Sequence, residues 1–197
     1  MLRTGAATRR RPTGRRGELF DELVALFLRE GFREFTVDAL AARLRCSKTT
    51  LYALADSRDA LVRAVVVHFF RGATERVEAR LAGARDDHER VLAYLRAVAD
   101  ELAAASPAFF DDLAASPTAR EVYERNTRAA ARRVERLIAG GVASGAFRPV
   151  HVGFVADVVS ATMVRIQQRE VAAATGLEDA QAYTALADLV TRGLART

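Results

Sequence analysis

The sequence has few of the residues that interrupt or cross-link a chain. Its 197 residues include one cysteine, Cys46, so no disulfide can form within the chain. Proline occurs only four times, so little prevents long helices. The most apolar stretch, 152–166, contains Asp157 and Arg165 and is too short to cross a bilayer. Because the first residues also lack the apolar core of a signal peptide, we expect a cytoplasmic protein that does not enter membranes.

Patterns typical of catalysis are also missing. A di-metal centre in a helical body needs a Glu three residues before a His, and none of His68, His88 or His151 has one. The sequence shows no glycine-rich phosphate loop, no cluster of cysteines and histidines, and no evident serine, histidine and aspartate set. These absences predict that the chain is not an enzyme and uses no metal or cofactor.

Alanine and leucine are abundant, and half of the residues are hydrophobic. Strand-like alternation is hard to find, whereas apolar residues recur at helical spacing along most of the chain. This pattern predicts an all-α fold of about nine helices, over residues 17–30, 36–44, 48–54, 57–81, 87–105, 106–115, 118–140, 150–174 and 178–195.

The stretch 36–58 reads as two short helices joined by a tight turn, followed by the start of a third helix. Thr36 and Ser47 are suitable N-caps for the two short helices. Asp38 lies in a first turn, where the positive end of a helix favours a carboxylate. Helices this short need a partner to pack on, and the apolar stripe of the preceding helix provides one.

This tri-helical pattern resembles the DNA-binding head of the TetR family of transcriptional regulators. The resemblance covers about residues 17–70 and is carried by Gly31, Phe32, Phe35, Thr36, Val37, Leu40, Ala41, Leu44, Ser47, Thr50, Leu51, Tyr52, Ser57, Arg58, Asp59 and Leu61. It implies three parts: a flexible basic arm (1–16), a helix-turn-helix DNA-binding head (17–60), and a helical body for ligand binding and dimerisation (61–197).

The sequence departs from the family pattern at three positions. Leu54 and Ala55 stand where members usually have His and then Phe, which removes a hydrogen-bond donor and a large ring. Arg45 stands where the turn commonly has Gly. If that position needs a positive φ, arginine there costs on the order of 1 kcal/mol. These departures concern the geometry of DNA recognition rather than the fold.

The resemblance also implies which residues meet DNA. The first turns of a helix in the major groove lie closest to the bases, so Lys48 and Thr49 are expected to read base edges. Thr50 and Tyr52 match positions that commonly contact phosphates. The predicted DNA-binding residues are Thr36, Ser47, Lys48, Thr49, Thr50, Tyr52, Arg58, Arg9, Arg10, Arg11, Arg15 and Arg16.

Positive charge is concentrated at the beginning of the chain. Residues 1–60 hold eleven Arg and one Lys against eight acidic residues, and residues 1–17 hold six Arg and no acid. A basic segment beside a DNA-reading unit is the electrostatic footprint expected of nucleic-acid binding. A solubilising tail is the alternative interpretation.

The last two expected helices carry more apolar surface than one packing partner would cover. This favours a homodimer through a four-helix bundle, as the resemblance also implies; the alternative is that they form the core of a monomer. The predicted interface residues are Val155, Val158, Val159, Thr162, Ile166, Tyr183, Leu186, Ala187, Val190 and Leu194.

In the resemblance the body encloses a pocket for a small, often hydrophobic effector. Aromatic or soft residues on separate helices, with one polar group, are candidates for its lining: Tyr94, Phe109, Phe110, Met163 and Gln167. The leading hypothesis is a repressor that binds an inverted-repeat operator in double-stranded DNA as a dimer and is released by a small-molecule effector. A ligand-independent DNA-binding protein is the alternative.

Overall fold

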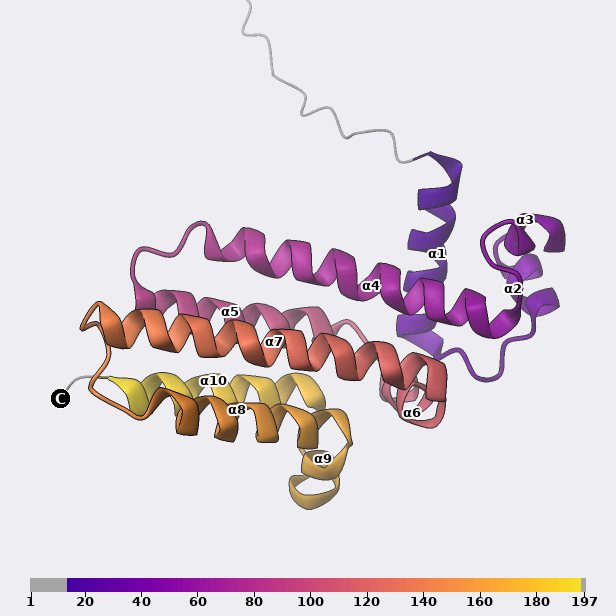
Figure 1. Cartoon of the computed structure of the whole chain (residues 1–197). Coiled ribbons are helices and arrows are strands. Elements are labelled where there is room, and N and C mark those ends of the chain that lie inside the picture. The colour runs from indigo at the N-terminus through magenta and orange to yellow at the C-terminus, as the bar shows by residue number, and fades with distance from the viewer. Residues whose placement is uncertain (1–13, 196–197) are drawn as a thin grey trace, which may run out of the picture.

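The computed structural model of the chain describes residues 14–195, which form ten α-helices and no strand (Figure 1). The helices are α1 (Arg15–Glu30), α2 (Val37–Arg43), α3 (Lys48–Tyr52), α4 (Arg58–Leu81), α5 (Asp87–Ala103), α6 (Pro107–Ala115), α7 (Pro117–Ala143), α8 (Val152–Gln167), α9 (Glu170–Thr175) and α10 (Asp179–Leu194). The predicted all-α class is confirmed.

Short polar side chains begin most helices, as the sequence indicates. The hydroxyls of Thr36, Ser47 and Ser57 each accept a hydrogen bond, at 3.0–3.1 Å, from the backbone N–H three residues later. α6 and α7 each begin with a proline directly after a capping serine. Proline suits this position because its missing N–H would have no helical partner.

One expected element is wrong: residues 150–174 are not a single helix. α8 ends at Gln167, and α9 begins after Arg169, whose φ of +62° lies in the left-handed region. The Arg169 guanidinium donates to Asp179 at 2.5 Å and to Glu178 at 3.4 Å, and it lies 5.8 Å from the centre of the Phe110 ring. These contacts come from other parts of the chain, so the helical periodicity around Arg169 gave no sign of the break.

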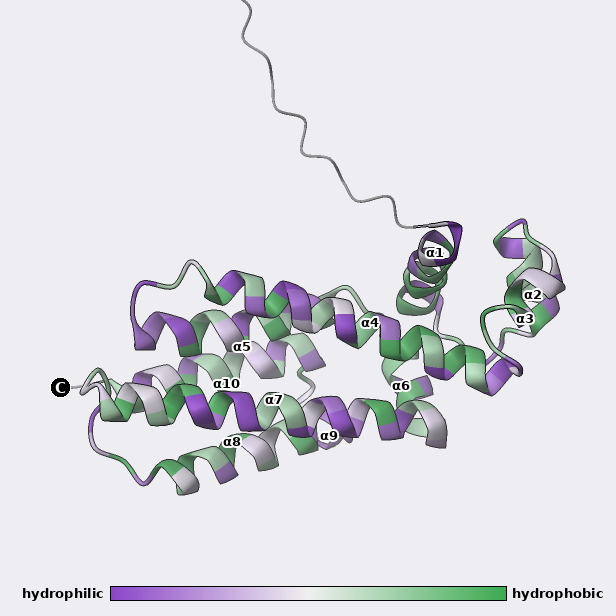
Figure 2. Ribbon diagram, turned by 45° about the horizontal axis from the view of Figure 1, so that its top comes forward, coloured by the Kyte–Doolittle hydropathy of each residue, from purple (hydrophilic) through white to green (hydrophobic). Residues whose placement is uncertain are grey.

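The helices form a small head and a longer helical body. α1, α2 and α3 make the head, and α4 extends from the head along the body (Figure 1). In the body α4 packs on α5 and α7, while α10 lies against α5 and α8 against α7. Figure 2 shows hydrophobic residues predominating in the half of α4 nearer the head. This half contributes Leu61, Val62, Val65 and Val66 to the core.

The loop between α1 and α2 is held from two sides. The Asp112 carboxylate of α6 accepts hydrogen bonds from the backbone N–H groups of Phe32 and Arg33, at 2.5 and 2.8 Å. Arg58, at the start of α4, donates three hydrogen bonds of 2.7–2.8 Å to carbonyls of the same loop. Gly31 has a φ of +75°, and a Cβ there would lie 2.5 Å from the Asp112 carboxylate. Glycine is therefore needed where the head meets α6.

Head and body share a continuous core through a row of aromatic rings. Phe32 of the head lies 6.0 Å from Phe109 of α6, which lies 5.7 Å from Phe69 of α4, measured between ring centres. Phe69 contacts Phe70 at 4.9 Å, and Phe70 stacks on Tyr123 of α7 at 5.3 Å. Such rings pack closely and in defined orientations. A displacement of Tyr123 is therefore passed along this row of rings to the head.

Candidate functional site

The helix-turn-helix is built from α2 and α3 and is held by local hydrogen bonds. The backbone N–H of Cys46 donates to the carbonyl of Ala41 at 3.0 Å, which closes the turn. The Ser47 hydroxyl caps α3 through the N–H of Thr50, and the two hydroxyls lie 2.8 Å apart. Buried Leu51 anchors α3 to the core. The hydroxyls of Ser47 and Thr50 are therefore hydrogen-bonded to each other at the start of α3.

Three predicted DNA-binding residues of α3 are exposed: Lys48, Thr49 and Tyr52. The Lys48 ammonium pairs with the carboxylate of Asp38 on α2, and both side chains are more than half exposed. An exposed pair of this kind contributes at most about 1 kcal/mol, so Lys48 can turn to another anion at little cost. Thr36 is exposed as well, with its hydroxyl engaged as the cap of α2.

Arg58 and Arg16, both predicted to bind DNA, donate hydrogen bonds to the protein's own backbone. The three hydrogen bonds of Arg58 to the α1–α2 loop occupy the guanidinium that was expected to meet DNA. Arg16 of α1 donates to the carbonyls of Ala53 and Leu54, at 2.9 and 3.2 Å. These carbonyls lie at the C-terminal end of α3, where a cation is favourable. Arg16 thus ties α3 to α1.

The turn residue Arg45 has a φ of +50°. The family pattern has glycine at this position, and the structure explains why: the turn needs the left-handed conformation. The Leu54 and Ala55 side chains, which replace the expected His and Phe, are half-buried and pack against the core.

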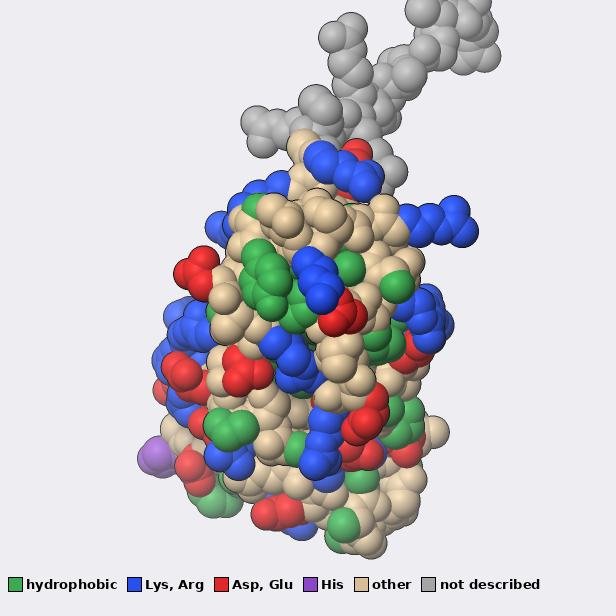
Figure 3. All heavy atoms as spheres, turned by 90° about the vertical axis from the view of Figure 1, so that its right-hand side faces the viewer, with side chains coloured by type: hydrophobic (Ala, Val, Ile, Leu, Met, Phe, Trp, Pro, Cys, Tyr) green, Lys and Arg blue, Asp and Glu red, His purple; other side chains and the backbone are tan. Residues whose placement is uncertain are grey.

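The described part of the head has no net charge. Residues 14–60 contain eight basic and eight acidic residues, so the excess in residues 1–60 comes from Arg3, Arg9, Arg10 and Arg11. The last three were predicted to bind DNA and lie outside the described residues, while Arg15 is exposed and 3.9 Å from Glu18. On the head-end face in Figure 3, basic and acidic side chains alternate rather than forming one basic surface.

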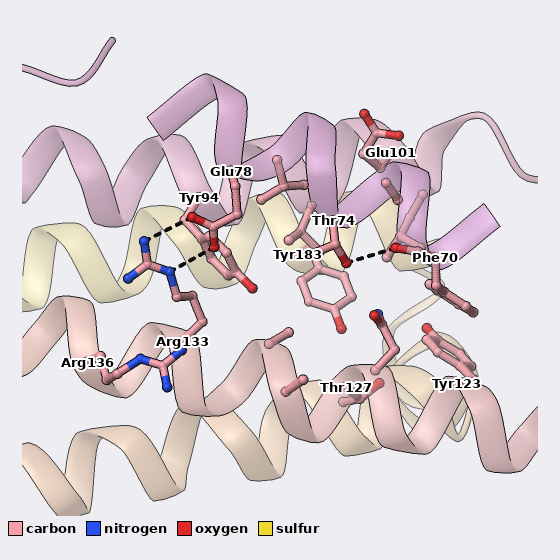
Figure 4. A pocket seen from close by; sticks show the side chains of 17 residues that line it. Phe70, Thr74, Glu78, Tyr94, Glu101, Tyr123, Thr127, Arg133, Arg136 and Tyr183 are labelled. Carbon is pink, nitrogen blue, oxygen red and sulfur yellow. Dashed lines mark hydrogen bonds and ion pairs between the residues drawn. The ribbon is translucent and has the colours of Figure 1, made fainter. Parts of the chain in front are cut away.

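A cavity of about 210 Å³ lies in the body between α4, α5, α7 and α10 (Figure 4). Its walls are mainly apolar, with Phe70 and Val77 from α4 and Leu102 from α5. Figure 4 shows the hydroxyl groups of Tyr123 and Tyr183 pointing into this space from opposite sides. The cavity is therefore a partly open, mainly apolar space with a few polar groups directed inward, the usual composition of a small-molecule site.

The hydroxyls of the cavity are kept in their neutral form. Burial raises the pKa of Tyr94 to about 12 and raises the pKa values of Tyr123 and Tyr183 well above the ordinary value for tyrosine. Tyr123 and Thr127 are 3% and 2% exposed, and their hydroxyls find no hydrogen-bond partner among residues 14–195. Orphaned buried hydroxyls are costly, so these two are available to a bound molecule.

The two carboxylates that line the cavity are already paired. Glu78 accepts two hydrogen bonds from Arg133, at 2.8 and 3.0 Å, and this pairing lowers the pKa of Glu78. Glu101 accepts from Arg76 at 2.7 and 3.0 Å. Arg136 adds a further positive charge on the side of Glu78. Each of the two carboxylates in the described lining is therefore paired with an arginine.

Of the five residues predicted to line an effector pocket, only Tyr94 lines this cavity. Phe109 and Phe110 lie in the aromatic row and its neighbourhood, and Met163 and Gln167 are buried between α8 and the rest of the body. The choice of aromatic and soft residues could not separate lining from core. Residues that the prediction missed, such as Tyr123 and Thr127, show no distinct sequence signal, because only the packing of α7 directs them inward.

A second concave surface, an apolar groove of about 410 Å³, lies on the outside of α8 and α10. Phe154, Val158 and Leu189 in this groove are 66%, 44% and 70% exposed, which is unusual for large apolar side chains. The predicted interface residues that line it are Val155, Val158, Val159, Thr162, Ile166, Leu186, Val190 and Leu194.

Two predicted interface residues do not lie in the groove. Tyr183 lines the inner cavity, and Ala187 is fully buried within the chain. Phe154 and Leu189 were missed, although helical spacing from Val158 and Leu186 would have found them. Among residues 14–195, no helix combines the length and the apolar character needed to cross a membrane.

A three-helix head with an exposed recognition helix, joined by a long helix to a body with an internal cavity, defines a class of helical DNA-binding regulators. Residues 19–65 match the family model described as bacterial regulatory proteins, tetR family. The match covers the head and the first part of α4, and the chain as a whole has the fold of solved structures described as TetR-family regulators.

Solved structures agree with this fold over nearly the whole chain. A transcriptional regulator from Saccharomonospora viridis in complex with choline is 17% identical, with a TM-score of 0.71 over 92% of this chain and 98% of that one. The ketosteroid transcriptional regulator KstR2 of Mycobacterium tuberculosis is 21% identical, with a TM-score of 0.57 over 94% and 97%. The TetR family regulator PfmR from Thermus thermophilus is 21% identical, with a TM-score of 0.55 over 90% and 99%. A search of curated proteins gave no significant match.

Proposed function

We propose that this chain is a transcriptional repressor that binds an inverted-repeat operator as a homodimer and leaves it when a small effector enters the body. The observation that carries the proposal is the pairing of an exposed recognition helix with an internal cavity in one continuous core. We divide the chain at about residue 60, within α4, into the DNA-binding head and the effector-binding body. Because such an operator lies on the bacterial chromosome, we expect the protein to act in the cytoplasm.

Base reading is assigned to the start of α3. Thr49 and Lys48 carry exposed polar atoms there, whereas the hydroxyls of Ser47 and Thr50 are mutually bonded. A threonine in the major groove offers a hydroxyl to a base and a methyl group to thymine. Tyr52 is exposed farther along α3 and is assigned to a phosphate, which positions the protein without reading sequence.

The dimer is assigned to the groove of α8 and α10. Its exposed Phe154, Val158 and Leu189 would be costly in a monomer, and a second copy of the same surface would bury them in a four-helix bundle. Two-fold symmetry then requires an inverted repeat, with half-sites about 34–36 Å apart for helices that enter successive major grooves.

Effector release is assigned to the cavity and the aromatic row. A molecule in the cavity contacts Tyr123, which stacks on Phe70 and through it reaches Phe69, Phe109 and the head. An effector that prefers one dimer geometry weakens DNA binding by its difference in affinity for the two geometries. The choline-bound relative supports a small-molecule site in a body of this fold. The cavity also favours this mechanism over a ligand-independent DNA-binding protein.

The test is selection of preferred DNA from a random pool, followed by binding to operators that carry every single base change. We expect Thr49→Ala to relax preference at one or two base pairs per half-site, at a cost of about 1–3 kcal/mol for the preferred base. Lys48→Ala should have a similar effect if Lys48 leaves Asp38 for a base.

Tyr52→Phe is the matched control, because removal of a phosphate-binding hydroxyl should weaken all sequences by a similar factor. Retention of the full preference profile by both Thr49→Ala and Lys48→Ala would refute the assignment of the reading residues. Absence of any selected sequence would refute the proposed function itself.

A further inference from the structure

Two of the polar groups that line the cavity are neutral hydroxyls without hydrogen-bond partners in the described residues. Tyr123 and Thr127 are both at least nine-tenths buried, line the cavity and are unsatisfied within the described residues. They lie four residues apart on α7, so their side chains share one face of that helix. Thr74, across the cavity on α4, differs because its hydroxyl already donates to the carbonyl of Phe70 at 2.8 Å.

The charges around the cavity disfavour a cation. Glu78 and Glu101 are each held by an arginine through two or more hydrogen bonds, so a cation would have to displace Arg133 or Arg76 to find a counter-charge. Phe70 and Tyr123 stack on each other with only 15° between their planes, which removes one face of each ring from contact with a cation.

The charges also disfavour an anion at the end where the free hydroxyls lie. The Asp179 carboxylate is 2% exposed, and one of its oxygens finds no partner among residues 14–195. Its negative charge acts on both Tyr123 and Tyr183 and contributes, after burial itself, to the raised pKa values of these tyrosines. Because Asp179 already pairs with Arg169, which acts on Tyr123 in the opposite sense, an anion near these hydroxyls would have to compete with Asp179 for that guanidinium. The α7 arginines of the lining lie farther along the helix: Arg133 and Arg136 are six and nine residues beyond Thr127, or about 9 and about 13.5 Å along the helix axis.

We infer that the cavity takes a compact, uncharged, mainly apolar molecule whose oxygen acceptor, such as a ketone or amide carbonyl, receives hydrogen bonds from Tyr123 and Thr127. At about 210 Å³ the cavity is smaller than the 300–1,000 Å³ of a typical drug-sized site, so the part of the molecule that it holds has the size of a substituted single ring. This inference rests on the proposed function only in taking the cavity as the effector site.

The experiment measures binding of three similar probes to the full chain by calorimetry: acetophenone, benzoate and benzylammonium. We expect acetophenone to bind once per chain, and the two ions to bind at least about 10-fold more weakly because neither finds a free counter-charge beside the Tyr123 and Thr127 hydroxyls. Tyr123→Phe and Thr127→Val should each weaken acetophenone binding about 2- to 10-fold, the effect of one neutral hydrogen bond.

Thr74→Val is the matched control in the same cavity: it removes a hydroxyl that is already satisfied and should leave acetophenone binding unchanged. Tyr123→Phe and Thr127→Val remove buried hydroxyls without partners, so both should remain folded, which circular dichroism checks. Absence of acetophenone binding, equal or tighter binding of either ion, or unchanged affinity in both hydroxyl variants would overturn the inference. Because no DNA is present, a protein that binds acetophenone but selects no DNA counts against the proposed function alone.

Discussion

At the scale of single residues, the head depends on side chains that act on backbone conformation. Arg58 and Arg16 hold a loop and a helix end through backbone carbonyls, and Gly31 allows Asp112 to approach. Arg45 is the exception, since it adopts a left-handed conformation that favours glycine and has no described hydrogen bond from its side chain in return. The turn of the helix-turn-helix therefore carries backbone strain.

Arg45→Gly should raise the free energy of unfolding by about 0.5–1 kcal/mol, because glycine relieves the strain but adds some entropy to the unfolded chain. Urea unfolding at a fixed protein concentration measures this gain. Arg45→Ala is the control: it removes the charge and keeps the strain, so stability should change little. An equal gain from alanine would show that charge, not backbone conformation, is responsible.

At the scale of elements, α6 bonds directly to the head. Its Asp112 binds two N–H groups of the α1–α2 loop, and Ser106, which caps it, donates its own N–H to the Leu28 carbonyl of α1 at 2.7 Å. Phe109 of the same helix belongs to the aromatic row. α6 is short, so its position depends on these contacts rather than on its own stability.

Asp112→Ala should free the α1–α2 loop, because it removes two charge-assisted hydrogen bonds. We expect a loss of about 1–3 kcal/mol in the free energy of unfolding and faster hydrogen exchange at the amides of Phe32 and Arg33. Asp111→Ala is the matched control on the same helix: Asp111 is 68% exposed and lies 3.7 Å from Arg169, away from the loop. Equal effects of the two changes would argue against a specific link.

At the scale of the whole molecule, two features concern how the chain meets other molecules. The groove on α8 and α10 exposes apolar side chains that a partner would cover. The described head is electrically neutral, so the positive charge expected to attract DNA resides in residues 1–13.

Val158→Glu should convert the protein to monomers, because it places a charge in the centre of an apolar contact. Val158 is 44% exposed in the single chain, so the change leaves its fold intact. Light scattering at micromolar concentration gives the mass. Thr184→Glu, exposed on α10 outside the groove, should leave the dimer unchanged. A monomeric unmodified protein would contradict the assigned interface.

Deletion of residues 1–13 should weaken binding to all DNA sequences and reduce the slope of log K against log salt by about 0.9 for each phosphate that the segment neutralises. This deletion retains Arg16, which supports α3. Replacing Arg9, Arg10 and Arg11 together by lysine keeps the charge and should retain most of the slope. A slope that does not change on deletion would mean that the segment makes no phosphate contact.

Much of the fold could be predicted from the sequence because its signals are local. Caps such as Thr36 and Ser47 and the apolar spacing of α4 act within a few residues, and they located nine of the ten described helices in outline. The conformation of Arg45 could also be anticipated from the glycine that the family pattern has at this position. For the same reason the exposed start of α3 and most of the apolar face of α8 and α10 were expected.

Only the tertiary structure decided the rest, since it depends on residues distant in sequence. The contacts of Arg169 with Asp179 and Phe110 divide an expected helix in two. The hydrogen bonds by which Arg16 and Arg58 support the head were likewise not visible in the sequence. Four helices together create the cavity, so aromatic composition identified one of its residues, Tyr94, and not the unpaired hydroxyls. Helical periodicity predicts which residues are buried. Whether a buried side chain contacts a neighbour or lines a cavity depends on how the helices pack.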